Sequence, residues 1–173
     1  MTKYLMAGAA LLCLTVPALA AETMTVETSA ACNFTIKLRA DLAPRHVAQI
    51  TKLAAAGFYD GVVFHRVIDG FMAQTGDPTG TGMGSSNEPD IPAEFTTTPF
   101  TRGIVGMARS DNPDSANSQF FVMLTRYPSL DNKYTVWGEV DDAGMVCLDK
   151  IKKGDPQTGL MDNPDKMIKV TVQ

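Results

Sequence analysis

Histidine, cysteine and tryptophan are scarce in this 173-residue chain, which holds two His, three Cys and one Trp. The two histidines, His46 and His65, stand apart, and no C-x-x-C or H-x-x-x-H spacing is present. A zinc site needs several such ligands, so the chain offers almost none. A G-x-S-x-G elbow is also missing, and a Ser-His-Asp triad would have to use one of these two histidines. The sequence therefore contains few residues that could bind a metal ion or catalyse nucleophilic hydrolysis.

Two loops have part of a ligand-binding motif without completing it. Gly80, Gly82 and Gly84 have the spacing of a dinucleotide-binding loop, but residues 85–89 follow instead of a helix N-terminus. Residues 111–114 are rich in Asp and Asn, yet their spacing does not match a calcium-binding EF-hand loop, and a solvated turn fits better. The sequence therefore predicts neither a metal ion nor an organic cofactor.

An excess of basic residues is absent as well. The chain has 15 Lys and Arg against 19 Asp and Glu, which gives a formal charge of −4 and a pI near 5.1. Nucleic acid requires a basic surface, and an anionic membrane surface attracts a basic amphipathic helix. Neither feature is present, so we expect no nucleic-acid partner and no membrane partner.

Long apolar runs are missing except near the N-terminus. An apolar stretch from Leu5 to Val16 follows one lysine and ends at Pro17, before a small-x-small sequence that signal peptidase reads. The stretch is shorter than the roughly 20 residues that span a bilayer. The sequence therefore predicts a signal peptide over residues 1–20 and one domain over residues 21–173, which contains no linker-like segment. The expected location is the periplasm, or the outside of the cell after secretion.

Cleavage after residue 20 would leave two cysteines, Cys32 and Cys147, in an oxidising compartment. They could form a disulfide that closes a very long loop. They could equally remain two separate buried thiols, because cysteine packs as a small apolar residue. The sequence alone does not decide between these two possibilities.

Apolar patterns organise the remaining chain. Apolar and polar residues alternate over 32–39, which predicts a half-buried strand. An apolar stripe over 43–56 predicts a helix that ends at Gly57, and residues 145–152 predict a second, shorter helix. Turn-forming residues separate the other predicted strands, at 62–64, 71–74, 104–108, 119–124, 134–140 and 167–172. Many strands, two helices and no βαβ alternation favour a mainly-β fold in which an antiparallel sheet closes into a barrel.

Residues 63–77 have the composition of an apolar pocket beside a fixed positive charge. A tight turn at Asp69-Gly70 joins two strands, and side chains alternate along each of them. Three side chains could thus meet on one concave surface: Arg66, either Phe71 or Met72, and Gln74. An arginine among aromatic and methionine side chains predicts a site for an apolar ring with a group of donors next to it. Taken singly, the same Phe and Met could be core residues and Arg66 a surface charge.

The order of these motifs is similar to the signature of the cyclophilin family. The resemblance runs through Phe64-His65-Arg66, Gly70-Phe71-Met72, Gln74, Gly76-Asp77, Gly80-Thr81-Gly82, Ser118-Gln119-Phe120-Phe121 and Leu130-Asp131. It extends over essentially the whole chain that would remain after cleavage. The resemblance implies a closed antiparallel barrel of eight strands, capped by two α-helices, with the active groove on its outer face.

The reaction that this resemblance implies is peptidyl-prolyl cis/trans isomerisation. Rotation about an X-Pro bond has a barrier of about 18–20 kcal/mol, because twisting destroys amide resonance. In the twisted transition state the prolyl nitrogen regains a lone pair, and a donor aimed at it stabilises that state more than the planar ground state. By resemblance, Arg66 is this donor. No covalent step, proton transfer, metal or cofactor is required.

The resemblance also implies the substrate contacts. The proline ring would lie on Phe71, Met72, Phe121 and Leu130. Gln74 would hold the carbonyl region of the substrate, and the backbone around Ala108 and Arg109 would bind the residues before proline. Gln119 would order the groove and Arg66, while Tyr134 would form a wall of the pocket.

Three positions depart from the best-known family pattern. Ser129 stands where many members have a Trp, Tyr134 replaces a His, and Arg109 replaces an Asn. The Tyr can still wall the pocket, so activity is expected to survive, whereas the missing Trp argues against strong cyclosporin binding. The expected partners are proline-containing unfolded or partly folded polypeptides, and a monomer is expected. The alternative function is a cyclophilin fold that binds proline segments as a chaperone with weak turnover.

Overall fold

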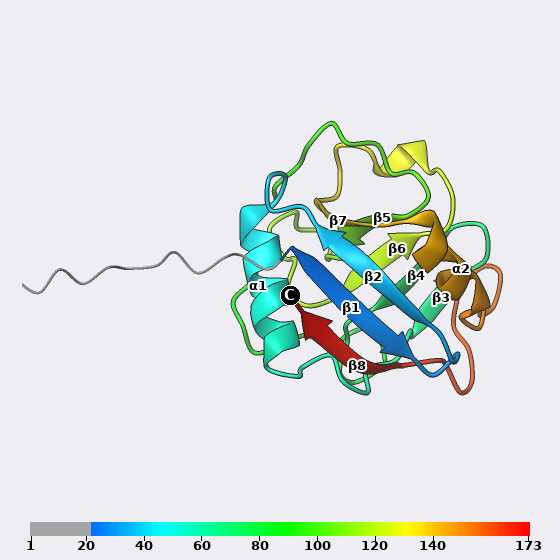
Figure 1. Cartoon of the computed structure of the whole chain (residues 1–173). Coiled ribbons are helices and arrows are strands. Elements are labelled where there is room, and N and C mark those ends of the chain that lie inside the picture. Colours follow the sequence, from blue (N-terminus) through cyan, green and yellow to red (C-terminus); the bar gives the residue numbers. More distant parts are fainter. Residues whose placement is uncertain (1–21) are drawn as a thin grey trace, which may run out of the picture.

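The computed structural model describes residues 22–173, so the predicted signal peptide lies outside the described part of the chain. This part contains eight strands and two α-helices (Figure 1). In chain order the elements are β1 Thr23–Thr28, β2 Asn33–Leu38, α1 Pro44–Ala55, β3 Arg66–Ile68, β4 Met72–Thr75, β5 Ile104–Met107, β6 Phe120–Met123, the 3-10 helix η1 Pro128–Leu130, β7 Val136–Val140, α2 Asp142–Lys150 and β8 Met167–Val172. Neither α-helix among these residues has the length and apolar character needed to cross a membrane.

The eight strands form one antiparallel sheet in the order β3-β4-β6-β5-β7-β2-β1-β8. The sheet curls strongly, and α1 and α2 lie on opposite sides of it in Figure 1. Because the order begins at β3 and ends at β8, the sheet is open but curled, and the closed barrel expected from the sequence is not shown. The backbone of residues 61–64, just before β3, hydrogen-bonds to residues 165–167, for example from Phe64 N to Asp165 O at 2.8 Å. The mainly-β antiparallel class with two helices is confirmed.

Three elements differ from their predicted positions. The strand predicted at 62–64 is only an isolated bridge between Val63 and Lys166, and the first strand after α1 is β3. β1 has no counterpart in the sequence prediction, because its Thr and Glu residues give it the composition of a polar lead segment; it pairs with both β2 and β8. α2 begins at Asp142 and not at residue 145, because the Asp141 side chain accepts a hydrogen bond from Gly144 N at 2.8 Å and caps the helix. The predicted hairpin around Asp69-Gly70 is confirmed, since β3 and β4 pair there.

The sheet separates two groups of buried side chains. Along β6, Phe120 and Val122 belong to the main core, whereas Phe121 and Met123 belong to a second, smaller cluster. Successive side chains of a strand point to opposite faces, so the second cluster lies on the other face of the sheet. Its buried members are Met72, Phe100, Ile104, Phe121, Met123 and Val136.

A disulfide joins Cys32, in the turn before β2, to Cys147 of α2. The bond spans a sequence separation of 115, and the two Cα atoms lie 5.5 Å apart, which is an ordinary distance for a disulfide. It ties α2 to the turn between β1 and β2. The structure thus contains the bond that the sequence left undecided.

Candidate active site

Strand register places the candidate site residues in one row across the sheet. Arg66 of β3 pairs with Gln74 of β4, and Gln74 pairs with Phe121 of β6. Phe121 pairs in turn with Gly106 of β5. Paired residues of neighbouring antiparallel strands point to the same face of a sheet. The arginine, the amide and the aromatic ring therefore lie side by side on the face that carries the second cluster.

A pocket of about 170 Å³ lies along this row. Its lining contains every site residue predicted from the sequence except Gln119: Arg66, Phe71, Met72, Gln74, Ala108, Arg109, Phe121, Leu130 and Tyr134. Met72 and Phe121 give the pocket an apolar floor, and this floor is buried, since Met72 is only 2% and Phe121 only 5% exposed. The structure therefore brings a buried apolar floor and a guanidinium to one small cavity.

Gly106 and Phe100 set the position of the Phe121 ring, and the sequence reasoning missed both. A Cβ at Gly106 would lie 2.6 Å from Phe121 Cζ and equally close to Phe100 Cε1, so only glycine leaves room for the two rings. Their centroids are 5.8 Å apart with planes inclined by 27°, and Tyr134 meets both rings edge-on. A glycine inside an apolar strand is the signal that could have identified this position.

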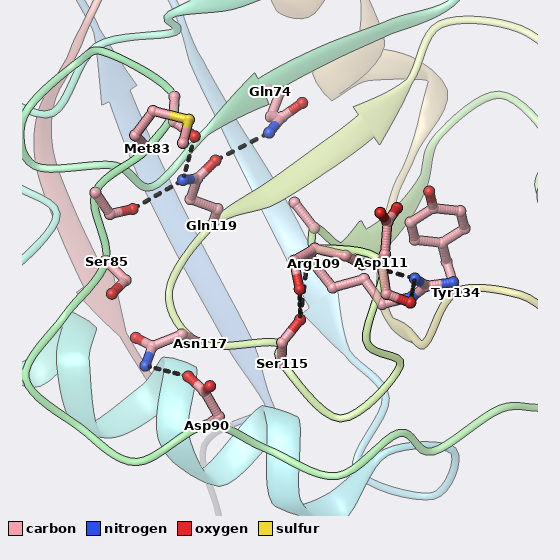
Figure 2. A pocket seen from close by; sticks show the side chains of 14 residues that line it. Gln74, Met83, Ser85, Asp90, Arg109, Asp111, Ser115, Asn117, Gln119 and Tyr134 are labelled. Atoms are coloured by element: carbon pink, nitrogen blue, oxygen red, sulfur yellow. Dashed lines mark hydrogen bonds between the residues drawn. The ribbon is translucent and has the colours of Figure 1, made fainter.

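A chain of hydrogen bonds holds Arg66 and the two glutamines. Arg66 Nε donates to the carbonyl oxygen of Thr158 at 3.0 Å, and its Nη1 lies 3.4 Å from Gln74 Oε1. Gln74 Nε2 donates to Gln119 Oε1 at 2.9 Å (Figure 2). Gln119 Nε2 donates to two carbonyl oxygens of the loop at 82–84, at 3.1 and 2.8 Å. Arg66 Nη2 makes no hydrogen bond within residues 22–173, so this nitrogen is left for a ligand.

A larger groove of about 660 Å³ adjoins the pocket and shares Gln74, Ala108, Arg109 and Tyr134 with it. Gln119 lines this groove, between the loop that carries Met83 and Ser85 and the segment around Arg109 (Figure 2). The Arg109 guanidinium carbon lies 4.6 Å from the centroid of the Tyr134 ring, a cation–π contact, and Nη2 donates to Lys133 O at 2.8 Å. The Arg109 side chain is therefore anchored at the boundary between the two cavities.

The backbone at residues 108 and 109 is only partly available to a substrate. Ala108 N donates to the carbonyl oxygen of Gln119 at 2.9 Å. The Ala108 carbonyl and the Arg109 amide make no hydrogen bond with residues 22–173. These two groups, rather than the Ala108 amide, are free to bind an extended peptide.

Both histidines lie outside this constellation. His46 is buried on α1, and its Nδ1 lies 2.6 Å from Glu94 Oε2; burial lowers the pKa of His46, against the opposing effect of Glu94. His65 is buried beside the loop of Gly82. Neither ring hydrogen-bonds to a serine, threonine or cysteine in the described chain. The histidine that a hydrolytic triad requires is therefore not supplied by this geometry.

Asp77 holds the glycine-rich loop that receives Gln119. Its carboxylate is fully buried and accepts hydrogen bonds from Thr79 N at 2.7 Å, Gly82 N at 2.6 Å and Gly84 N at 3.1 Å. Burial raises the pKa of Asp77, but the hydrogen bonds from Thr79, Gly84 and Gly82 outweigh burial and lower this pKa to about 2. Two of the three glycines that have the spacing of a dinucleotide-binding loop, Gly82 and Gly84, thus donate to an internal carboxylate.

We expect acid to release this loop. The pKa of Asp77 lies at about 2 in the fold against an ordinary 3.8, so its carboxylate stabilises the fold fully above about pH 4. That stabilisation, about 2 kcal/mol, should be lost as the pH falls toward about 2. Asp77→Asn should therefore be less stable near neutral pH, and its unfolding free energy should fall less between about pH 5 and pH 2 than that of the wild type.

Urea unfolding at a series of pH values measures this difference. Asp111→Asn is the matched control, because Asp111 is exposed and its side chain accepts no hydrogen bond within the described residues. An unaltered pH dependence in Asp77→Asn would contradict the role given to the buried carboxylate.

The chain that carries this site matches a protein-family model. The model described as "Cyclophilin type peptidyl-prolyl cis-trans isomerase/CLD" matches residues 23–172, which is nearly all of the described chain. The chain belongs to the cyclophilin family of peptidyl-prolyl cis-trans isomerases. Within this cyclophilin, the matched residues include every candidate site residue that lines the pocket and the groove.

The names of individual relatives are consistent with this family assignment. A Brucella suis protein named "Probable peptidyl-prolyl cis-trans isomerase" is 55% identical over 150 residues, which cover 80% of this chain and 76% of the relative. An Aspergillus oryzae protein named "Peptidyl-prolyl cis-trans isomerase-like 1" is 40% identical over 144 residues, covering 80% and 86%. A Cryptosporidium parvum cyclophilin, crystallised in the presence of the dipeptide Ala-Pro, superimposes with a TM-score of 0.79 at 25% identity, over 87% of this chain and 98% of that one.

Proposed function

We propose that this cyclophilin accelerates the cis/trans isomerisation of X-Pro bonds in exported proteins and so assists their folding. The observation that carries the proposal is the placement of Arg66 beside an apolar pocket. Its Nε is held by Thr158 O at 3.0 Å, while Nη2 is free of partners in the described chain. A rigid donor next to an apolar floor suits a prolyl ring with its nitrogen directed at the guanidinium.

In this mechanism Arg66 acts on the twisted amide. As the X-Pro bond rotates, the prolyl nitrogen becomes pyramidal, and Nη2 donates a hydrogen bond to its new lone pair. Because Thr158 and Gln74 hold the guanidinium beforehand, little reorganisation is needed when that lone pair forms. The guanidinium stabilises the transition state more than either planar isomer, so rotation becomes faster in both directions.

The other residues position the substrate. Phe121 and Met72 support the proline ring, and the amide of Gln74 keeps one N–H free of Gln119 for a substrate carbonyl. The Arg109 amide and the Ala108 carbonyl bind the segment that precedes proline, which extends into the larger groove. Proline-containing unfolded or partly folded chains are the proposed substrates.

Two features support the export part of the proposal. The N-terminal 20 residues have the pattern of a cleavable signal peptide. The described chain contains a disulfide between Cys32 and Cys147, and disulfides persist in oxidising compartments such as the periplasm. We propose a periplasmic location after cleavage behind Ala20, with the protein acting as a monomer.

Expression of the full chain in a Gram-negative host tests the proposal. The protein should be recovered in the periplasmic fraction with Ala21 as its first residue, and it should speed the proline-limited refolding of a disulfide-containing exported protein. Leu12→Arg, which interrupts the apolar run, should leave uncleaved protein in the cytoplasm. Recovery of the wild type only in the cytoplasm would contradict export, and an unchanged refolding rate would contradict the catalytic role.

A further inference from the structure

An exposed aromatic ring continues one wall of the pocket. Phe71 lines the 170 Å³ pocket, and its ring centroid lies 4.4 Å from that of Tyr127, with planes inclined by 41°. Tyr127 is 42% exposed and is not part of the pocket lining. The two rings together, which we name the Phe71–Tyr127 surface, extend the apolar wall from the pocket lining to the exposed ring of Tyr127.

The backbone fixes Tyr127 in this position. Tyr127 N donates to Phe100 O at 2.9 Å, and Pro128 begins the 3-10 helix η1 directly after it. Arg126 and Asp131 pair across this turn, with Nη1 2.9 Å from Oδ1, and Asp131 Oδ1 also accepts from Phe100 N at 2.8 Å. A ring with few rotamers on a fixed turn loses little entropy when it binds a ligand.

The Tyr127 hydroxyl makes no hydrogen bond within residues 22–173, so it does not contribute to holding the turn. Its ring packs against the ring of Phe71, and the residue is partly open to solvent. An exposed aromatic side chain beside a binding pocket has apolar area available for a ligand.

The Phe71–Tyr127 surface lies on the side of the pocket that the larger groove does not share. The residues common to both cavities are Gln74, Ala108, Arg109 and Tyr134, and Phe71 is absent from the groove. If the segment before proline occupies the groove, the chain after proline leaves the pocket past Phe71. The first side chain beyond proline then meets the ring of Tyr127.

We propose that Tyr127 is a specificity-determining residue of this isomerase. With Phe71 it binds the side chain of the residue that follows proline, and it favours aromatic side chains over glycine. This inference rests on the proposed function, because it assigns a side chain of the same substrate. A purely structural role, in which Tyr127 only covers Phe71, would not distinguish between substrates.

Isomerisation of two tetrapeptides, Ala-Ala-Pro-Phe and Ala-Ala-Pro-Gly, tests this proposal by NMR exchange, which requires no coupling protease. The wild type should show a KM about fivefold lower for the Phe peptide, a ratio expected from one aromatic contact. Tyr127→Ala should bring this ratio close to one through KM rather than kcat. Tyr127→Phe should keep it, and Tyr127→Leu, which retains apolar cover over Phe71, should lose most of it.

Phe95→Ala is the matched control, because Phe95 is also 42% exposed and lies outside both cavities. Its activity and peptide ratio should equal those of the wild type. An equal loss for both peptides in Tyr127→Ala, or an unchanged ratio, would overturn the specificity role. A wild type that accelerates both peptides equally refutes this inference alone, whereas one that accelerates neither refutes the proposed function.

Discussion

Replacing Arg66 by alanine should lower kcat/KM for proline tetrapeptides by about 10²–10³-fold, with the fold intact. Loss of one preorganised donor to a developing charge typically costs about 3–4 kcal/mol of transition-state stabilisation. The substitution removes the donor but leaves the apolar floor of Phe121 and Met72, so KM should change much less than kcat. A protease-coupled or NMR assay on an Ala-Ala-Pro-Phe peptide measures both constants.

Two variants sharpen this test. Arg66→Lys keeps a positive charge but not the rigid fork that donates to Thr158 O and faces Gln74, so it should recover only a small part of the activity. Arg45→Ala removes an exposed arginine of α1 whose side chain makes no hydrogen bond in the described chain, and it should behave as the wild type. An undiminished rate in Arg66→Ala would favour the alternative, a proline-binding chaperone module, or another catalytic residue.

Loss of the Cys32–Cys147 disulfide should lower the free energy of unfolding by about 4–5 kcal/mol. The bond closes a loop with a sequence separation of 115, and a cross-link over so long a loop strongly restricts the unfolded chain. The double variant Cys32→Ser with Cys147→Ala suits the half-buried first position and the buried second one. Urea unfolding, with and without reductant, measures the effect.

The reductant provides an internal control. It should destabilise the wild type to about the level of the double variant, and it should leave the double variant unchanged. Equal stability of the oxidised and reduced wild type would contradict the contribution assigned to this bond. Isomerase activity of the folded double variant should persist, since neither cysteine lines the pocket.

The parts of the site that could be predicted from sequence are those set by local strand geometry. Arg66 and Gln74 belong to one hairpin, and period-two alternation together with the register set by the turn at Asp69-Gly70 places their side chains on one face. Phe121 joins them only through the register between β4 and β6, which no local pattern contains. Leu130 and Tyr134 lie in the segment after β6, and only the family resemblance associated them with the pocket.

The parts that could not be predicted depend on contacts between distant segments. Gly106 contributes to the site because the Phe100 and Phe121 rings approach its backbone. Tyr127 contributes because its turn places its ring against Phe71. β1 has weak local character and exists because β2 and β8 flank it. Predicting the disulfide would have required knowing that α2 lies close to a turn that precedes it by more than a hundred residues.

The two edge strands of the curled sheet, β3 and β8, are the places where an unfolded chain could pair with this protein. An uncovered edge strand is a template on which an unfolded chain can aggregate. In β3, Val67 N donates to Gly159 O at 3.0 Å and Val67 O accepts from Gly154 N at 2.9 Å. At β8, Met167 O accepts from Gly61 N at 2.7 Å. At these positions the protein's own loops already use the hydrogen-bonding groups at the two ends of the sheet, so fewer of these groups remain for an unfolded chain to pair with.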